Sequence, residues 1–207
     1  MTGGRNEAYI LLEDGTRLDG DACAAPGAAT GEVVFTTGMS GYQESVTDPS
    51  FAGQILTFTY PHIGNYGVSA QAMESDRVWT RAVIMREAVD TDDAPSAVQG
   101  WLSWLADRGV PAISGVDTRA LVRHIREAGS MRGGVFGAEV AEDEALERVR
   151  GEAPMAGQDL ARVVTRAETT VHGDGTGTRI AAIDTGIKSS IVRHLVQRGA
   201  TVELHPA

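Results

Sequence analysis

A run of threonine, glycine and aspartate at residues 165–178 is the feature that most limits how this chain can fold. The run reads TRAETTVHGDGTGT and carries too little apolar surface to order itself as part of a core. We therefore predict a domain over residues 1–165, a linker over residues 166–178 and the start of a second domain over residues 179–207. At 42% hydrophobic residues, the chain has enough apolar side chains for a sizeable core.

The segment after the linker has the pattern of one strand-helix-strand unit. RIAAID at residues 179–184 predicts an apolar strand, and residues 201–204 predict another. The helix between them has its apolar side chains on one face and ends near Gly199: these are Ile191, Val192, Leu195 and Val196. Such a unit cannot cover both faces of its sheet alone and normally continues into a doubly wound parallel sheet. We expect Ile191, Val192 and Leu195 to expose apolar surface.

The first domain begins with strand patterns. Residues 9–12 and 16–22 flank Asp14-Gly15, a pair that supplies the positive φ angles of a tight hairpin turn. Further segments rich in β-branched and aromatic residues lie at 31–36, 54–60, 81–85 and 111–114. Together these segments predict a mixed sheet.

Three helices complete the first domain. The first is predicted to start at Ser96, with Gln99 as its capping-box partner, and to bury one apolar face: Val98, Trp101, Leu102 and Leu105. The second has Asp117 as N-cap, Val116 and Leu121 as a hydrophobic staple, and Gly129 beyond its end. The third covers residues 142–150, with Leu146 and Val149 facing inward. The predicted fold class is α/β.

The composition argues against several partners. A net charge of −10 and a pI near 4.9 repel phosphate backbones and anionic lipid headgroups, so we expect neither nucleic acid nor membrane as a partner. No apolar stretch near the start is long enough for a signal or a membrane span. Cys23 is the single cysteine, which excludes an intrachain disulfide and fits a reducing, cytoplasmic location.

Common catalytic and metal-binding motifs have the wrong spacing here. Gly38-Met39-Ser40-Gly41 lacks the Gly-x-Ser-x-Gly order of a nucleophile elbow, and the segment 185–189 lacks the glycines of a phosphate-binding loop. The five histidines are scattered, and His62 stands alone, so we predict no metal site. Asp19 and Asp21 precede Cys23 and raise a thiol pKa, which predicts an unreactive thiol.

Thr47-Asp48-Pro49-Ser50 has the composition of a turn. Asp48 can bond to the backbone two residues on, and Pro49 fixes its own φ angle. By itself this segment predicts a structural turn with no chemical role.

Several longer segments resemble one known family. GEVVFTTGMSGYQESVTDPSFAGQILTFTYPHIGNYG at residues 31–67 is similar to the N-terminal domain of carbamoyl-phosphate synthase small subunits, and residues 115–134 and 155–165 resemble the same family. Residues 180–207 resemble the opening of that family's class I glutamine amidotransferase domain. The resemblance implies a β/β/α domain of the swivelling type, followed by the first β-α-β unit of the amidotransferase sheet.

The resemblance also implies a division of labour. In that family the small subunit hydrolyses glutamine through a cysteine thiolate helped by a histidine and a glutamate. The ammonia passes to the large subunit, which uses ATP and magnesium to make carbamoyl phosphate for arginine and pyrimidine synthesis. We therefore expect the large subunit and L-glutamine as partners, and no cofactor in this chain.

One site residue carries over from the family. The serine of its Asp-Pro-Ser segment helps to hold glutamine and corresponds to Ser50, which makes Ser50 the predicted substrate-binding residue. The family's cysteine, histidine and glutamate have no counterpart in these 207 residues, so no catalytic residue is predicted. Lys188-Ser189-Ser190 departs from the family's lysine followed closely by asparagine.

Two hypotheses follow for the chain itself. The first is a glutamine-dependent carbamoyl-phosphate synthase small subunit that stops before its catalytic cysteine and is inactive alone. The second is a noncatalytic interaction module that docks on the large subunit or a regulatory partner.

Overall fold

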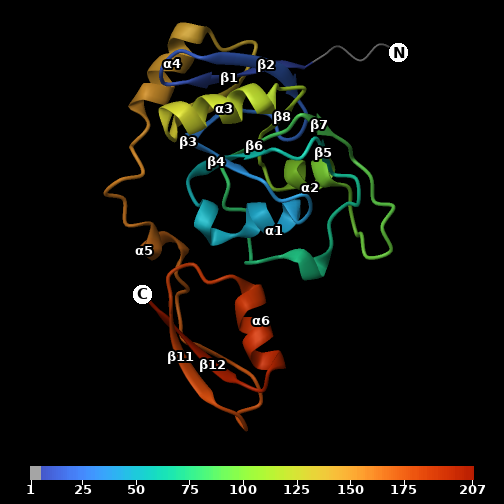
Figure 1. Ribbon diagram of the computed structural model, residues 1–207, viewed down its shortest axis with the longest axis vertical. Coiled ribbons are helices and arrows are strands. Elements are labelled where there is room, and N and C mark those ends of the chain that lie inside the picture. Colours follow the sequence, from blue (N-terminus) through green and yellow to red (C-terminus); the bar gives the residue numbers. More distant parts are fainter. Residues whose placement is uncertain (1–5) are drawn as a thin grey trace.

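The computed structural model describes residues 6–207 and divides into two units, a seven-stranded barrel and a smaller three-stranded unit (Figure 1). The barrel strands are β1 (Glu7–Leu12), β2 (Arg17–Ala22), β3 (Ala29–Thr36), β4 (Gln54–Phe58), β6 (Ala82–Ile84), β8 (Ala112–Ser114) and β9 (Met131–Gly137). The short strands β5 (His62–Ile63) and β7 (Glu87–Ala88) pair with each other. The α/β class is therefore confirmed.

The barrel closes because its last strand returns to its first. The order is β1-β2-β8-β6-β4-β3-β9, and β9 pairs antiparallel with both β1 and β3. Strands β3, β4, β6 and β8 run parallel to their neighbours within that set, so the sheet is mixed as predicted. The hairpin of β1 and β2 is also confirmed, with Gly15 at φ 90°.

Strand β9 was not predicted, because its sequence MRGGVFG has two adjacent glycines where strands normally carry branched side chains. Side chains larger than glycine at these positions would collide with residues of the neighbouring strands. A Cβ atom at Gly133 would lie 2.6 Å from Val33 Cγ2 and 2.9 Å from Leu12 Cδ2. The closure of the barrel therefore depends on a strand that propensity alone hides.

The three helices predicted for the first domain are present, but one of them starts later than predicted, and the helices at Tyr42–Thr47 and Leu160–Val164 were not predicted. α3 (Thr118–Ala128) is capped by Asp117, which accepts from the amide of Ala120, and Gly129 follows at φ 98°. Helix α2 (Trp101–Asp107), however, begins after Gly100 and not at Ser96. The predicted Ser96 cap is wrong, because Asp90 from a distant loop accepts from the amides of Leu102 and Ser103.

The core lies inside the barrel and beneath its helices. Leu121 and Ile125 of α3 pack onto barrel residues, and α4 (Glu142–Gly151) buries Ala145 and Val149 against β1 and β9. α1 (Tyr42–Thr47) packs with α2, where Trp101 is fully buried with its ring 4.7 Å from that of Tyr42. Val98, predicted to be buried, is instead 71% exposed because it precedes the helix.

The smaller unit is the predicted strand-helix-strand. β11 (Arg179–Asp184) and β12 (Thr201–Pro206) are parallel and joined by α6 (Ser189–Gln197). β10 (Thr170–His172), which lies within the predicted linker, adds an antiparallel strand to β12. Ile191 is 47% exposed as expected, but Val192 is only 6% exposed because it packs on Val202 and Leu204.

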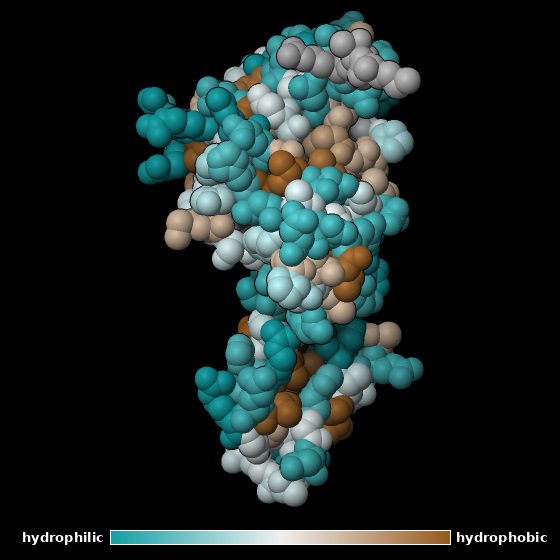
Figure 2. Space-filling model, turned by 90° about the vertical axis from the view of Figure 1, so that its right-hand side faces the viewer, coloured by the Kyte–Doolittle hydropathy of each residue, from teal (hydrophilic) through white to brown (hydrophobic). Residues whose placement is uncertain are grey.

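A connecting segment with the short helix α5 (Leu160–Val164) leads from the barrel to the smaller unit (Figure 1). In the side view of Figure 2 the two units meet over a narrow waist, and apolar side chains reach the surface of the smaller unit. Among residues 6–207 no helix has the length and apolar character needed to cross a membrane.

We expect Gly133→Ala to destabilise the barrel by about 1–3 kcal/mol, because the added methyl group overpacks the contact between β9, Leu12 and Val33. Urea unfolding followed by circular dichroism measures this change. Gly151→Ala is the matched control, since a Cβ there meets nothing within 4 Å. Equal stability of both variants would contradict the role given to Gly133.

Candidate functional site at the junction of the two units

The site is built around the turn that follows α1. The Asp48 side chain accepts from the amide of Ser50 at 2.9 Å, and Pro49 opens a single 3-10 turn (Pro49–Phe51). The predicted turn is thus confirmed. Asp48 is 8% exposed, whereas Ser50 is exposed and its hydroxyl makes no hydrogen bond within residues 6–207.

Buried polar side chains of α1 fix this turn to the segment 66–75. Gln43 accepts from the amide of Ser69 and donates to its carbonyl oxygen. The Thr47 hydroxyl accepts from the amide of Glu74 at 3.0 Å, and the Thr47 carbonyl accepts from the Ser75 hydroxyl at 2.7 Å. Because buried polar groups need partners, these bonds hold α1 and Glu74 in one fixed arrangement.

Glu74 reaches across the junction to the start of α6. Its carbonyl oxygen accepts from the amide of Ser189 at 2.8 Å, and its carboxylate Oε2 accepts from the amide of Ser190 at 2.9 Å. The residue before α6, Lys188, offers no side-chain cap. Glu74 therefore caps α6 from the other unit, and its negative charge stands at the positive end of the helix dipole.

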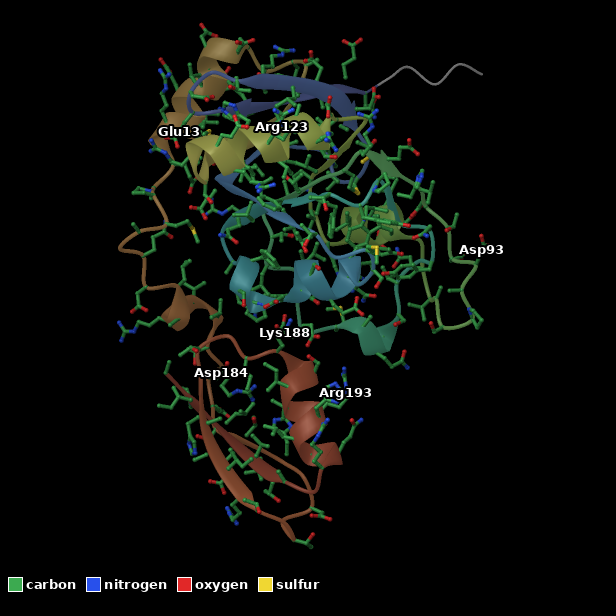
Figure 3. All side chains as sticks on the ribbon, in the orientation of Figure 1. Glu13, Asp93, Arg123, Asp184, Lys188 and Arg193 are labelled. Carbon is green, nitrogen blue, oxygen red and sulfur yellow. The ribbon has the colours of Figure 1, made fainter. Side chains whose placement is uncertain are left out.

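A second contact joins the same surfaces. Lys188 Nζ lies 3.3 Å from Asp48 Oδ2, so one carboxylate binds the Ser50 amide with one oxygen and the lysine with the other. A Cβ on Gly186 would lie 3.1 Å from Pro49 Cβ, so the loop before α6 packs closely on the turn. Figure 3 shows Lys188 at the top of the smaller unit, below α1.

The loop that carries Lys188 is fixed by Asp184 at the end of β11. Its carboxylate accepts from the amides of Gly186 and Ile187 and from the Arg166 guanidinium at 2.9 Å. Burial alone raises the pKa of Asp184, but these hydrogen bonds outweigh it and leave the pKa below its usual value. Asp184 is therefore ionised at neutral pH and orients the loop.

A cavity of about 480 Å³ lies beside this junction, and both units contribute to its lining. Pro49 and Glu74 come from the barrel side, and Asp184 and Ser189 from the smaller unit. Ser50 does not line this cavity. The structure thus brings Asp48, Glu74 and Lys188 together and leaves the Ser50 hydroxyl free at the edge of the same contact.

Cys23, predicted to be unreactive, is half-buried and packs against the core around Trp101. Burial raises the pKa of its thiol to about 11, and the charge of Asp21 adds to the effect. The sequence pointed to the acidic neighbours, but burial is the larger cause. His62 is exposed and pairs with Glu87 at 2.9 Å, and within residues 6–207 no group of three or more potential ligands could hold a metal ion.

The protein is an α/β protein of two units, the barrel and the strand-helix-strand unit, which meet at the junction. Sequence comparisons identify its family. Residues 10–135 match the family described as carbamoyl-phosphate synthase small chain, CPSase domain. The small chains of Xanthomonas campestris pv. campestris and Streptomyces coelicolor are 40% and 41% identical over 97% and 98% of this chain. The chain belongs to the carbamoyl-phosphate synthase small-chain family, as the resemblance predicted.

These relatives are longer than this chain, which spans 57% and 54% of their lengths. The small chain of Symbiobacterium thermophilum, 42% identical over 95% of this chain, gives a similar share of 55%. Two solved structures, a subtilisin-like protease and an aminopeptidase, match with TM-scores of only 0.34 and 0.39 and 18% and 12% identity. Those two matches are too weak to bear on the fold.

Sequence reasoning proposed Ser50, which stays a prediction, and missed Glu74. A lone glutamate in an irregular segment gives no periodic signal, and its role depends on an amide 116 residues away. Lys188 was noted only as part of a departure from the family pattern. The missing side-chain cap at the start of α6 was the one signal that could have prompted a search for a distant acceptor.

We expect Glu74→Ala to weaken the junction by about 0.5–2 kcal/mol, the usual range for loss of a helix N-cap. Glu74→Gln keeps an oxygen that can accept from Ser190 and should retain most of the stability. Hydrogen exchange of the Ser190 amide, which loses the carboxylate as its acceptor, measures the effect directly. Asp76→Ala, which removes an exposed carboxylate two residues away, is the control. Unchanged exchange in Glu74→Ala would refute the capping role.

We expect Cys23 to react slowly with iodoacetamide in the folded protein. A rise of its pKa from 9.0 to about 11 lowers the thiolate fraction near neutral pH roughly 100-fold. Mass spectrometry of the alkylated protein, folded and in urea, compares the two rates. Similar rates in both states would show that the thiol is neither buried nor shifted.

Proposed function

We propose that this chain is the part of a glutamine-dependent carbamoyl-phosphate synthase small subunit that docks on the large subunit and contributes to glutamine binding. In the complete enzyme, ammonia released from glutamine passes to the large subunit for synthesis of carbamoyl phosphate, a precursor for arginine and pyrimidines. ATP and magnesium act on the large subunit, and the enzyme works in the cytoplasm. Membership of the small-chain family carries this proposal.

The proposed domain organisation follows from the same family. Residues 1–165 form the docking domain of the swivelling type, residues 166–178 the linker, and residues 179–207 the first unit of the amidotransferase domain. The parallel pairing of β11 with β12 through α6 supports the last assignment, since doubly wound sheets are built from such units. In this view β10 ties the linker to the second domain.

Ser50 is the proposed glutamine contact. Its hydroxyl is exposed and without a hydrogen-bond partner in residues 6–207, so it is available to a ligand. The turn that carries it is fixed by Asp48, which also binds Lys188 of the smaller unit. A hydroxyl held in this way can donate to a substrate bound on the amidotransferase side, with little conformational freedom lost.

The nucleophile for glutamine hydrolysis has no candidate in these 207 residues. Cys23 is their single cysteine, and its pKa of about 11 keeps it protonated at neutral pH. A second candidate function is an interaction module, in which these residues dock on the large subunit or a regulatory partner. Both candidates use the barrel as the docking domain, and they differ in whether Ser50 contacts glutamine.

Ser50→Ala separates the two candidates. In the protein as its gene encodes it, assembled with the large subunit, we expect the KM for glutamine to rise about 10-fold, the effect of one lost hydrogen bond. Carbamoyl phosphate synthesis from added ammonia should not change, since it bypasses glutamine. Ser40→Ala, an exposed serine in the loop before α1, is the control. Stable assembly with an unchanged glutamine KM would favour the interaction module.

A further inference from the structure

The outer face of α3 carries three arginines in one stripe. Arg119, Arg123 and Arg126 are spaced i, i+4 and i+7, which places them on the same side of the helix, and all three are exposed. They line a groove of about 560 Å³ together with Thr59, Thr118, Val122 and Glu127. Figure 3 shows Arg123 on α3, well away from Lys188 and Asp184 of the junction.

These arginines lack the partners that most other arginines of the protein have. Within residues 6–207, Arg119 and Arg126 make no ion pair and no side-chain hydrogen bond, and Arg123 approaches only Glu127, at 4.0 Å. By contrast, Arg132 binds Glu13 through two guanidinium nitrogens, and Arg81 binds Glu152. In a chain of net charge −10, a row of three exposed arginines, two of them without an acidic partner in residues 6–207, is a local exception.

The stripe is held rigidly. Asp117 caps the helix, and Leu121 and Ile125 on its opposite face are buried in the barrel core. Because like charges on adjacent turns repel, the arrangement does not favour the helix itself. It does present three forked donors in a fixed row, which suits recognition of carboxylates.

The length of the arginine stripe indicates which kind of anionic partner can contact all three arginines at once. Seven residues of helix span about 10 Å, more than one phosphate ion can bridge. Alternate side chains of an extended strand are about 7 Å apart, and side chains one turn apart on a helix are about 5 Å apart. Two or three acidic residues of a protein segment therefore match the length of the arginine stripe. The net negative charge of the chain disfavours the longer phosphate backbone of a nucleic acid.

We propose that the α3 groove, lined by Arg119, Arg123 and Arg126, docks an acidic segment of the large subunit. This inference rests on the proposed function and specifies which face of the barrel carries the interaction. Exposed charges of this kind act chiefly on the association rate and on its dependence on salt. The groove therefore guides assembly, while the junction around Glu74 faces the amidotransferase side.

The test uses the natural protein and its purified large subunit. A triple variant, Arg119→Glu, Arg123→Glu and Arg126→Glu, should associate at least about 10-fold more slowly at low salt and lose most of the salt dependence. Arg86→Glu is the matched control, because Arg86 is also exposed and without a side-chain partner in residues 6–207 but lies outside the groove. Circular dichroism and melting temperature confirm that each variant is folded, and Arg119→Ala with Arg126→Ala is a milder second variant.

The outcomes are distinct. If the wild type binds the large subunit and both groove variants bind it with the same rate and salt dependence, the groove is not the docking site and the proposed function stands. If the wild type does not bind the large subunit at all, the proposed function fails and the inference with it. If the groove variants lose binding to a labelled RNA oligonucleotide but keep their binding to the large subunit, the groove serves RNA and the inference is overturned.

Discussion

The contact of Glu74 with the start of α6 is the interaction on which the relation of the two units depends. Its carbonyl and carboxylate oxygens accept from two of the free amides that open the helix, and Lys188 next to them pairs with Asp48. Glu74 is in turn held by the Thr47 hydroxyl, so the end of α1, the Ser50 turn and α6 form one hydrogen-bonded set. Since Glu74 is 7% exposed, loss of its partners leaves a buried polar group without a hydrogen bond, and this couples α1 to the start of α6.

The fold could be predicted where a local rule determines the structure. The hairpin at Gly15, the cap of α3 at Asp117 and the strand-helix-strand unit all follow from signals within a few residues, and all are confirmed. The errors fall where a distant group overrides the local signal. Asp90 caps α2 and displaces the start predicted at Ser96, and the glycines of β9 hide a strand that only the closed barrel explains.

The candidate site also contains features that local sequence predicts and features that depend on distant contacts. Ser50 was predicted through a resemblance of sequence and stays a prediction, whereas the turn that holds it follows from the chemistry of Asp48 and Pro49. Glu74 and the pairing of Asp48 with Lys188 join residues more than a hundred positions apart, and no periodicity reports such a contact. Asp184 could be predicted only in part. Its place at the end of a parallel strand is typical of site residues, but its hydrogen bond to Arg166 is known only from the structure.

At the junction, Asp48, Glu74 and Asp184 position other groups through their hydrogen bonds and ion pairs. Asp184 is ionised and saturated with hydrogen bonds, the carboxylates of Asp48 and Glu74 are each occupied by groups across the junction, and the Cys23 thiol is kept protonated by burial. Each of the three carboxylates therefore already has at least one hydrogen-bond or ion-pair partner. Within residues 6–207, the Ser50 hydroxyl and the guanidinium groups of Arg119 and Arg126 are among the groups without a side-chain partner. These are the groups that the proposals use: Ser50 for glutamine and the arginines of α3 for the large subunit.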